Sequence, residues 1–237
     1  MSEARPVGRQ PSPPKITITR NGPYRVAGAI PLAKQTIETD SEGQSREWQA
    51  GPGIEVTDIY RLCRCGQSAT KPFCDESHLK VEFDGTETAS RAPYLEQAER
   101  IDGPAMELTD AEALCAWARF CDPDGQVWGL IEETDDPEAR DKVRHQTGHC
   151  PSGRLVAWDK ATKEPYEPVF EPSIGLVEDP HAGVSGGLWV RGGIAVESPD
   201  GTAYEVRNRV TLCRCGSSSN KPFCDGSHAS VGFKDGL

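Results

Sequence analysis

LCRCGQSATKPFCDESH (62–78) and LCRCGSSSNKPFCDGSH (212–228) are two nearly identical stretches that decide the fold of this chain. Each contains three cysteines and one histidine in the spacing C-x-C-x8-C-x3-H, and the second copy lies 150 positions after the first. Thiolates and imidazoles are ligands for Zn²⁺, for Cu(I) and for iron–sulfur clusters. The repeated spacing predicts two metal sites, whose ligands are Cys63, Cys65, Cys74, His78, Cys213, Cys215, Cys224 and His228.

The repetition extends beyond the cysteines and predicts a small β-rich unit around each metal loop. GPYRVAGAI (22–30) matches GGLWVRGGI (186–194), and both alternate apolar with small or polar residues, as a strand does. Each copy is expected to form a strand, a loop, a second strand, the metal loop and a closing strand at 81–83 or 231–233. The offset between the copies falls from 164 to 150 along the repeat, so the first copy has 14 extra residues, in the polar stretch around 34–53.

The spacing within each loop also suggests how the ligands converge. Side chains at i and i+2 of an extended chain point the same way, so the C-x-C pair can close on one metal atom. Asp75 and Asp225 are good helix N-cap residues, which places the third cysteine at a helix start and the histidine one turn later.

KPFCDGSH, preceded by C-x-C, is similar to the signature of the CDGSH iron–sulfur family. The second copy has every defined position of that signature, whereas the first has Glu76 in place of the glycine. The resemblance implies one [2Fe–2S] cluster per motif, with the C-x-C pair on one iron and the third cysteine with the histidine on the other. Members of the family usually pair two motifs across a homodimer, and here the tandem copies could pair within one chain.

Glu76 has two interpretations. If its position requires a positive φ, glutamate costs about 1 kcal/mol or more. If it is the first residue of a helix, glutamate is favourable there. We expect the second arrangement, with the first site still metallated.

A Cys₃His zinc site is the alternative to iron, but structural zinc sites usually use C-x2–4-C pairs rather than C-x-C.

A neutral imidazole in place of one thiolate makes a [2Fe–2S] cluster less negative. This predicts acid-labile clusters whose potential depends on pH and exceeds that of plant-type ferredoxins.

The segment between the repeats carries the remaining cysteines. Thr109 and Glu112 form a capping-box pattern that predicts a helix over 110–120, and a second helix is predicted from Asp136 to Gly148. Residues 115–155 resemble a divergent single-cluster ferredoxin domain. The resemblance implies a [3Fe–4S] or [4Fe–4S] cluster held by Cys115, Cys121 and Cys150, with His149 as a substitute ligand, or else a domain that keeps the fold without its cluster.

The net charge and the cysteine content indicate which kinds of partner and which compartment to expect. The net charge is −11, which disfavours a nucleic-acid partner. Six of the nine cysteines lie in the two metal motifs, so a reduced, cytoplasmic chain is expected rather than a disulfide scaffold. No apolar run approaches the roughly 20 residues that a membrane span needs.

We therefore expect an α+β fold, with two small β-rich CDGSH units forming an internal pseudo-dimer and a ferredoxin-like helical insert. The expected boundaries are a disordered tail at 1–15, the first repeat at 16–88, the middle domain at 89–180 and the second repeat at 181–237. The expected function is electron transfer, or storage and transfer of clusters, by a monomer that meets a redox partner protein or a cluster acceptor. No catalytic constellation is visible. The alternatives are an iron–sulfur subunit that feeds a catalytic partner and a zinc-stapled interaction module.

Overall fold

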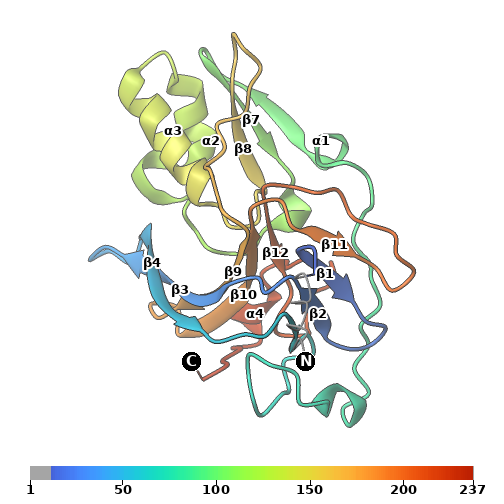
Figure 1. Ribbon diagram of the computed structural model, residues 1–237. Helices are drawn as coiled ribbons and strands as arrows, with labels where there is room; N and C mark the ends of the chain where they lie inside the picture. Colours follow the sequence, from blue (N-terminus) through green and yellow to red (C-terminus); the bar gives the residue numbers. More distant parts are fainter. Residues whose placement is uncertain (1–11, 237) are drawn as a thin grey trace, which may run out of the picture.

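The computed structural model describes residues 12–236, which form an α+β fold of three β-sheets and a few short helices (Figure 1). The first sheet has the order β11 (Ala195–Glu197), β1 (Lys15–Ile18), β2 (Tyr24–Ala27) and β5 (Ile59–Leu62). The second has the order β12 (Arg209–Leu212), β10 (Val184–Arg191), β9 (Ser173–Asp179), β3 (Leu32–Thr39) and β4 (Ser45–Ile54). The third consists of β6 (Glu99–Asp102), β7 (Met106–Asp110) and β8 (Leu155–Asp159).

The two larger sheets exchange strands between the sequence repeats. β3 follows β2 in the chain, yet it pairs in parallel with β9 of the second sheet. In the same way β11 follows β10 and pairs in parallel with β1 of the first sheet. The 14 extra residues of the first copy coincide with the long β3–β4 hairpin, which extends the second sheet. Each metal loop therefore leaves a sheet that contains a strand from the other repeat.

One hydrophobic core lies between these two sheets. Ile16 and Ile18 of β1, and Leu188 and Val190 of β10, belong to the same buried cluster. Full burial of such a side chain contributes roughly 1.5–3 kcal/mol. Leu62 and Leu212, the last residues of β5 and β12, are also fully buried there, so the start of each metal loop is fixed by the core.

The middle segment packs β6, β7 and β8 against α2 (Val127–Leu130) and α3 (Pro137–His149), which lie above the larger sheets in Figure 1. The start of α3 is as predicted, because the Asp136 side chain accepts a hydrogen bond from the Glu138 N–H and Pro137 is the first helical residue. The helix ends at His149, one residue beyond the predicted Gly148. The remaining helical turns are α1 (Tyr94–Gln97), α4 (Ser227–Ser230), η1 (Ser77–Leu79), η2 (Glu112–Leu114), η3 (Pro123–Gly125) and η4 (Ile131–Glu133).

The predicted helix over 110–120 is wrong. Thr109 and Asp110 belong to β7, which pairs with β8. The Thr109 hydroxyl lies 2.9 Å from Trp158 Nε1 and 3.2 Å from the Val156 carbonyl, so it is not available as a helix cap. The chain then makes the short turn η2, and Trp117 and Arg119 have φ values of 54° and 62°, which no right-handed helix contains. Sheet pairing has overridden the local helical pattern.

Two other expectations need correction. Of the expected tail 1–15, residues 1–11 lie outside the described part, and Lys15 already begins β1. The closing strands at 81–83 and 231–233 do not form. Phe83 instead packs against the first C-x-C pair and Phe233 against the second.

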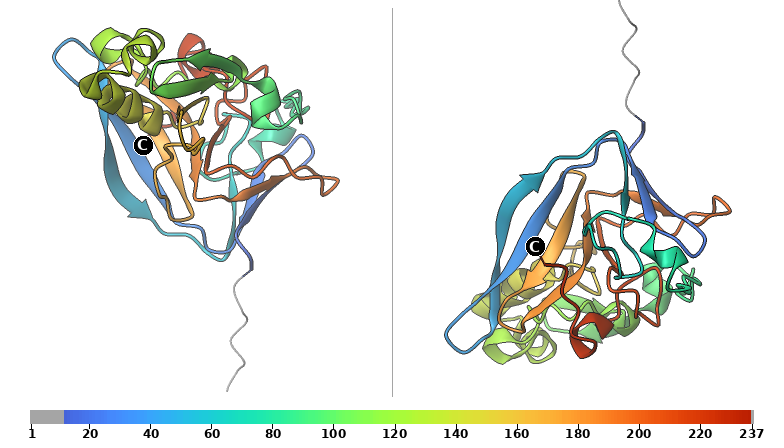
Figure 2. Two further views of the ribbon diagram at one scale, coloured as in Figure 1. Left: turned by 90° about the horizontal axis from the view of Figure 1, so that it is seen from above. Right: turned by 90° about the horizontal axis from the view of Figure 1, so that it is seen from below.

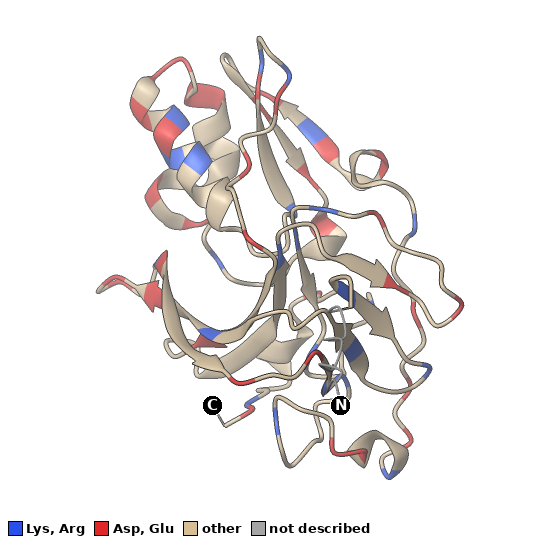
Figure 3. Cartoon of the chain, in the orientation of Figure 1, with Lys and Arg blue, Asp and Glu red and all other residues tan. Residues whose placement is uncertain are grey.

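Charge is spread over the surface rather than gathered in one basic face. In Figure 3 acidic segments are dense around the helices of the middle unit, with Lys and Arg interspersed. Figure 2 shows this unit at one end of the larger sheets. No helix within residues 12–236 is long and apolar enough to cross a bilayer.

Candidate metal centres

Each metal loop folds back on the strand that precedes it. In the first repeat the Cys63 N–H donates to the Pro72 carbonyl at 2.8 Å and the Cys74 N–H donates to the Arg61 carbonyl at 3.0 Å. The second repeat repeats the pattern, with Cys213 donating to Pro222 at 2.8 Å and Cys224 donating to Thr211 at 2.9 Å. These backbone bonds bring the third cysteine alongside the C-x-C pair, as the spacing predicted.

The predicted ligands approach one another in pairs. The Sγ atoms of Cys63 and Cys65 are 3.8 Å apart, and those of Cys213 and Cys215 are also 3.8 Å apart. His78 Nδ1 lies 3.5 Å from Cys74 Sγ, and the corresponding atoms of His228 and Cys224 lie 3.4 Å apart.

These separations are those of ligands on a tetrahedral metal atom. With metal–thiolate bonds of about 2.3 Å and metal–imidazole bonds of about 2.0 Å, two thiolates lie about 3.8 Å apart, and a thiolate and an imidazole about 3.5 Å apart. Among the described residues, however, no three of these ligand atoms lie within 4.8 Å of one another. Each pair thus fits its own metal atom, and the four residues of a motif fit a two-metal centre better than a single Zn²⁺.

Acidic side chains organise both loops. One carboxylate oxygen of Asp75 accepts from Ser77 N at 3.0 Å and the other from Ala69 N at 2.8 Å. Asp225 does the same with Ser227 N at 3.0 Å and Ser219 N at 2.7 Å. The hydrogen bonds from Ala69 and Ser77 hold the pKa of Asp75 well below its usual range. The prediction that the two aspartates are N-caps is wrong: Glu76 and Gly226 occupy the N-cap positions without a side-chain cap, and each helical turn begins one residue later.

Glu76 contradicts our expectation. Its φ is 71°, and Gly226 has the corresponding φ of 84°, so this position is left-handed in both repeats. Glu76 therefore carries the backbone cost of about 1–2 kcal/mol that glycine avoids. Its side chain makes only an exposed ion pair with Arg61, at 3.1 Å, which offsets little of that cost.

The segment 115–119 covers the second metal loop, whereas the histidine of the first metal loop is partly exposed. A Cβ on Gly226 would lie 3.1 Å from the Cβ of Trp117, so the 115–119 segment packs directly on this residue. The Trp117 ring also meets His228 edge-on, with centroids 6.4 Å apart. His228 is 3% exposed, and burial followed by the charge of Arg214 lowers its pKa to about 4. His78 is only partly buried.

The arginine inside each C-x-C pair is a site residue that sequence reasoning missed. Arg214 is buried, and it donates to the Gly186 carbonyl at 2.9 Å, the Val177 carbonyl at 2.7 Å and Glu178 at 2.9 Å. Arg64, also buried, donates to the Gly85 carbonyl at 2.7 Å. Both side chains anchor the metal loops to the rest of the fold. The signal was present in the sequence, because Arg is the middle residue of C-x-C in both copies.

The two metal loops touch each other. A Cβ on Gly66 would collide with the Cys215 carbonyl, and a Cβ on Gly216 would collide with the Cys65 carbonyl. Glycine is required at both positions because each has a positive φ and faces the opposite loop. The two centres are therefore neighbours within one chain.

Five of the six thiols in the two metal motifs are buried, and the sixth, Cys74, is partly exposed. Burial, followed by the nearby charge of Cys63, raises the pKa of Cys65 to about 11, and burial also raises that of Cys224. Cys213 and Cys215 share a proton through their hydrogen bond, which lowers the pKa of Cys213 to about 6 and raises that of Cys215. A bound metal must displace these protons, so metal binding and proton release are coupled.

The three middle cysteines line one recess. Cys115, Cys121 and Cys150 surround it together with Pro151 and Arg154. Arg154 makes a bidentate pair with Asp110 at 2.6 and 2.8 Å and also faces Cys115. Burial, followed by the charge of Asp122, raises the pKa of Cys121 well above its usual range, so a cluster bound here would have to displace its proton.

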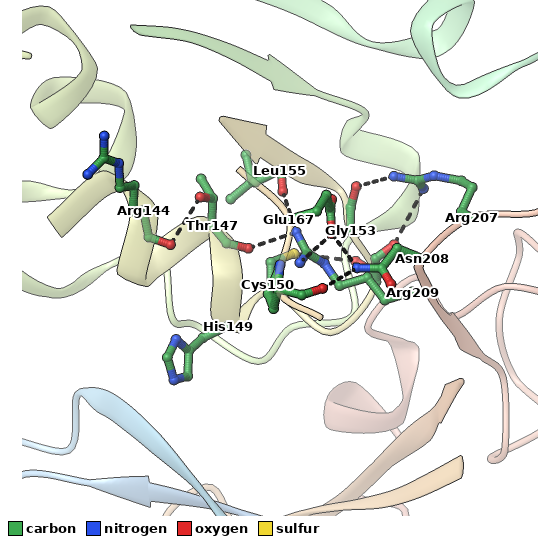
Figure 4. A network of polar contacts seen from close by, with 12 residues as sticks. Arg144, Thr147, His149, Cys150, Gly153, Leu155, Glu167, Arg207, Asn208 and Arg209 are labelled. Carbon is green, nitrogen blue, oxygen red and sulfur yellow. Dashed lines mark hydrogen bonds and ion pairs between the residues drawn. The ribbon is translucent and has the colours of Figure 1, made fainter. Parts of the chain in front are cut away.

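A buried arginine holds the loop of Cys150 in place (Figure 4). Arg209 of β12 donates to the Thr147 carbonyl at 3.0 Å and to the Leu155 carbonyl at 3.3 Å, and it pairs with Glu167 at 2.9 Å. These contacts tie the end of α3 and the start of β8 to the second repeat. The recess is thereby fixed relative to the second metal loop.

His149 does not join the middle recess. In Figure 4 its ring points away from Cys150, toward the β3–β4 hairpin. Its Nε2 lies 3.0 Å from a carboxylate oxygen of Glu47 on β4. The alternative in which His149 completes a middle cluster is therefore wrong.

Comparison with protein families agrees with this geometry. A family model described as "iron-binding zinc finger CDGSH type" matches residues 21–79 and 185–229. The chain carries tandem CDGSH domains. A second model, described as "divergent 4Fe-4S mono-cluster", matches residues 101–160 between the two CDGSH domains, so this is an iron–sulfur protein. Searches against curated proteins and solved structures give no match.

Proposed function

We propose that each CDGSH domain binds one [2Fe–2S] cluster. In the first cluster one iron is held by Cys63 and Cys65 and the other by Cys74 and His78. In the second cluster one iron is held by Cys213 and Cys215 and the other by Cys224 and His228. The observation that carries this proposal is the paired spacing of 3.8 Å and 3.4–3.5 Å, together with the separation between the pairs. A single zinc ion would draw all four ligand atoms of a motif together.

The two domains act as an internal pseudo-dimer. The crossed pairing of β3 with β9 and of β11 with β1 supports this arrangement, because each domain lends the other a strand. The contacts of Gly66 and Gly216 with the opposite loop place the two clusters side by side. No second chain is needed, and we expect a monomer.

The middle domain adds a third cluster, of the [3Fe–4S] or [4Fe–4S] type, on Cys115, Cys121 and Cys150. The recess that the three cysteines line together supports this assignment. The segment from Cys115 to Trp117 reaches Gly226 and His228, so the third cluster is adjacent to the second CDGSH cluster.

The function that follows is to carry electrons or whole clusters between partner proteins, in the cytoplasm and without catalysis by the chain itself. Bound clusters supply one-electron redox chemistry. The residues of this chain orient the ligands, exclude water at the second site and leave the first site more accessible to a partner.

Iron content of ligand variants tests the assignment. C74S and C224S should each remove about two irons per chain, whereas C115S should remove only the iron of the middle site. The matched control is S217A, whose side chain is not a proposed ligand and which should keep its full iron content. Zinc in place of iron in anaerobically prepared protein, or full iron content in C74S and C224S, would refute the proposal.

A further inference from the structure

We infer that Glu47, His145 and His149 form a separate binding site for a divalent transition-metal ion. The three lie outside all the cysteine sites, on β4 and α3, and their ligand atoms all fall within 4.8 Å of one another. Nε2 of His145 is 3.0 Å from one carboxylate oxygen of Glu47, and Nε2 of His149 is 3.0 Å from the other.

Helix geometry presents the two imidazoles together. His145 and His149 are four residues apart on α3, and their rings stack with centroids 4.1 Å apart and an interplanar angle of 28°. Glu47 is brought opposite them because the neighbouring Trp48 donates from Nε1 to the His149 carbonyl at 3.0 Å. Trp48 itself packs on Phe120 and Trp189, with centroids 4.8 and 4.7 Å away, so the backbone beside Glu47 is firmly placed.

The contacts of His149 decide which of its ring nitrogens faces Glu47. Nδ1 lies 2.7 Å from the His145 carbonyl, which can only accept, so Nδ1 is the donor of this hydrogen bond. Nε2, the other ring nitrogen, faces Glu47, and one carboxylate oxygen of Glu47 lies 3.0 Å from it. Both atoms are ligand atoms that one metal ion could share.

The donor set favours a metal. A hydrogen bond from Nδ1 to a backbone carbonyl is the arrangement that orients metal-binding histidines. Two imidazoles and a carboxylate suit Zn²⁺ with one position left open, and iron(II) shares this ligand chemistry. A tetrahedral ion with bonds of about 2.0 Å needs ligand atoms about 3.3 Å apart, so the pairs now at 3.0 Å need to open by only a few tenths of an ångström.

The surroundings are suited to a cation. His149 is in the last turn of α3, where the helix dipole favours positive charge. A hollow of about 420 Å³ opens beside Glu47 and His145, and its lining includes Asp124, Glu138 and Asp141. Two cations also line the hollow, and both are already paired: Arg46 with Asp40 at 2.7 Å and with Asp124 at 2.5 Å, and Lys142 with Glu138 at 2.7 Å. A bound ion would join the β3–β4 hairpin to the middle unit.

Zinc uptake by cluster-loaded, full-length protein tests the site. After equilibrium dialysis against Zn²⁺, metal analysis should find one zinc per wild-type chain with the iron content unchanged. E47Q and H145A should each weaken zinc binding by about 100-fold and lose the rise in unfolding temperature that zinc gives the wild type. The matched control is H181A, which removes a histidine outside the cluster and should bind zinc as the wild type does.

Two outcomes would overturn the inference. One is a wild-type chain that takes up no zinc while keeping its iron, which would mean that the cluster of side chains holds only a proton. The other is equal zinc uptake by wild type, E47Q and H145A. Zinc bound at the cysteine motifs in place of iron would appear in H145A as well and would lower the iron content. The iron content therefore distinguishes a failure of the proposed cluster assignment from a failure of this inference. All three side chains are at least partly exposed, and circular dichroism with the iron content confirms that the variants fold.

Discussion

Replacing Gly226 by alanine should destabilise the second CDGSH domain, whereas replacing Glu76 by alanine at the corresponding position should not destabilise the first. Both positions are left-handed, with φ of 84° and 71°. Alanine at Gly226 gains a backbone cost of about 1–2 kcal/mol. Its Cβ would also press on the Trp117 Cβ at 3.1 Å, for which a further cost of about 1 kcal/mol is reasonable.

Glu76 already has a side chain in this conformation, so alanine adds no strain there. The change removes only the ion pair with Arg61, whose side chains are 50% and 57% exposed. Such pairs contribute little, and the expected loss is within about 0.5 kcal/mol.

The assay is guanidinium unfolding of the cluster-loaded protein, followed both by far-ultraviolet circular dichroism and by the visible absorbance of the clusters. G226A should lower the free energy of unfolding by about 2–3 kcal/mol relative to wild type. In the W117G background, which lacks the Cβ at position 117, the same change should cost about 1 kcal/mol less, because the contact is gone. Equal stability of G226A and E76A would refute the reasoning.

Three further predictions concern the middle unit and the two histidines. R209M should destabilise the protein by about 3 kcal/mol, measured by chemical denaturation, since it removes a buried charged donor from the Thr147 and Leu155 carbonyls and from Glu167, which keeps only its hydrogen bond from Asn208; a loss below about 1 kcal/mol would contradict this. W117A should speed loss of the second cluster in air, measured by visible absorbance, and an unchanged rate would show that Trp117 does not shield it. On acidification the second cluster should outlast the first, because His228 is buried whereas His78 is partly exposed to water. Burial lowers the pKa of His228 to about 4, so the stability that its neutral ring contributes is complete above about pH 6.5 and is lost progressively between about pH 6.5 and pH 4. Absorbance during acid titration of C74S and C224S separates the two sites, and the reverse order would refute this prediction.

The sequence was most informative where structure is set locally. The spacing C-x-C-x8-C-x3-H was sufficient to predict which cysteines and histidines approach one another in pairs, and Asp136 with Pro137 was sufficient to place the start of α3. Local patterns failed where pairing with distant strands decides the conformation. Thr109 carries a capping-box pattern but lies in β7, because β8 supplies its partners.

Contacts between distant residues could not be predicted from one sequence. The exchange of β3 and β11 between the large sheets depends on parallel pairing with strands more than a hundred residues away. Glu47 and His145 are 98 positions apart, so nothing in the spacing pointed to their meeting. The conformation of Glu76 was misjudged because a glutamate at a helix start is favourable locally, while the requirement for a left-handed residue comes from the closure of the metal loop.

Combined analysis of iron, acid-labile sulfide and zinc in anaerobically purified protein tests the central claim most directly. Two [2Fe–2S] clusters predict about four irons and four sulfides per chain, and the middle cluster adds about three or four irons and about four sulfides. The cysteine motifs should contain no zinc, and any zinc found should disappear in H145A. About two zinc ions per chain with no sulfide would contradict the account.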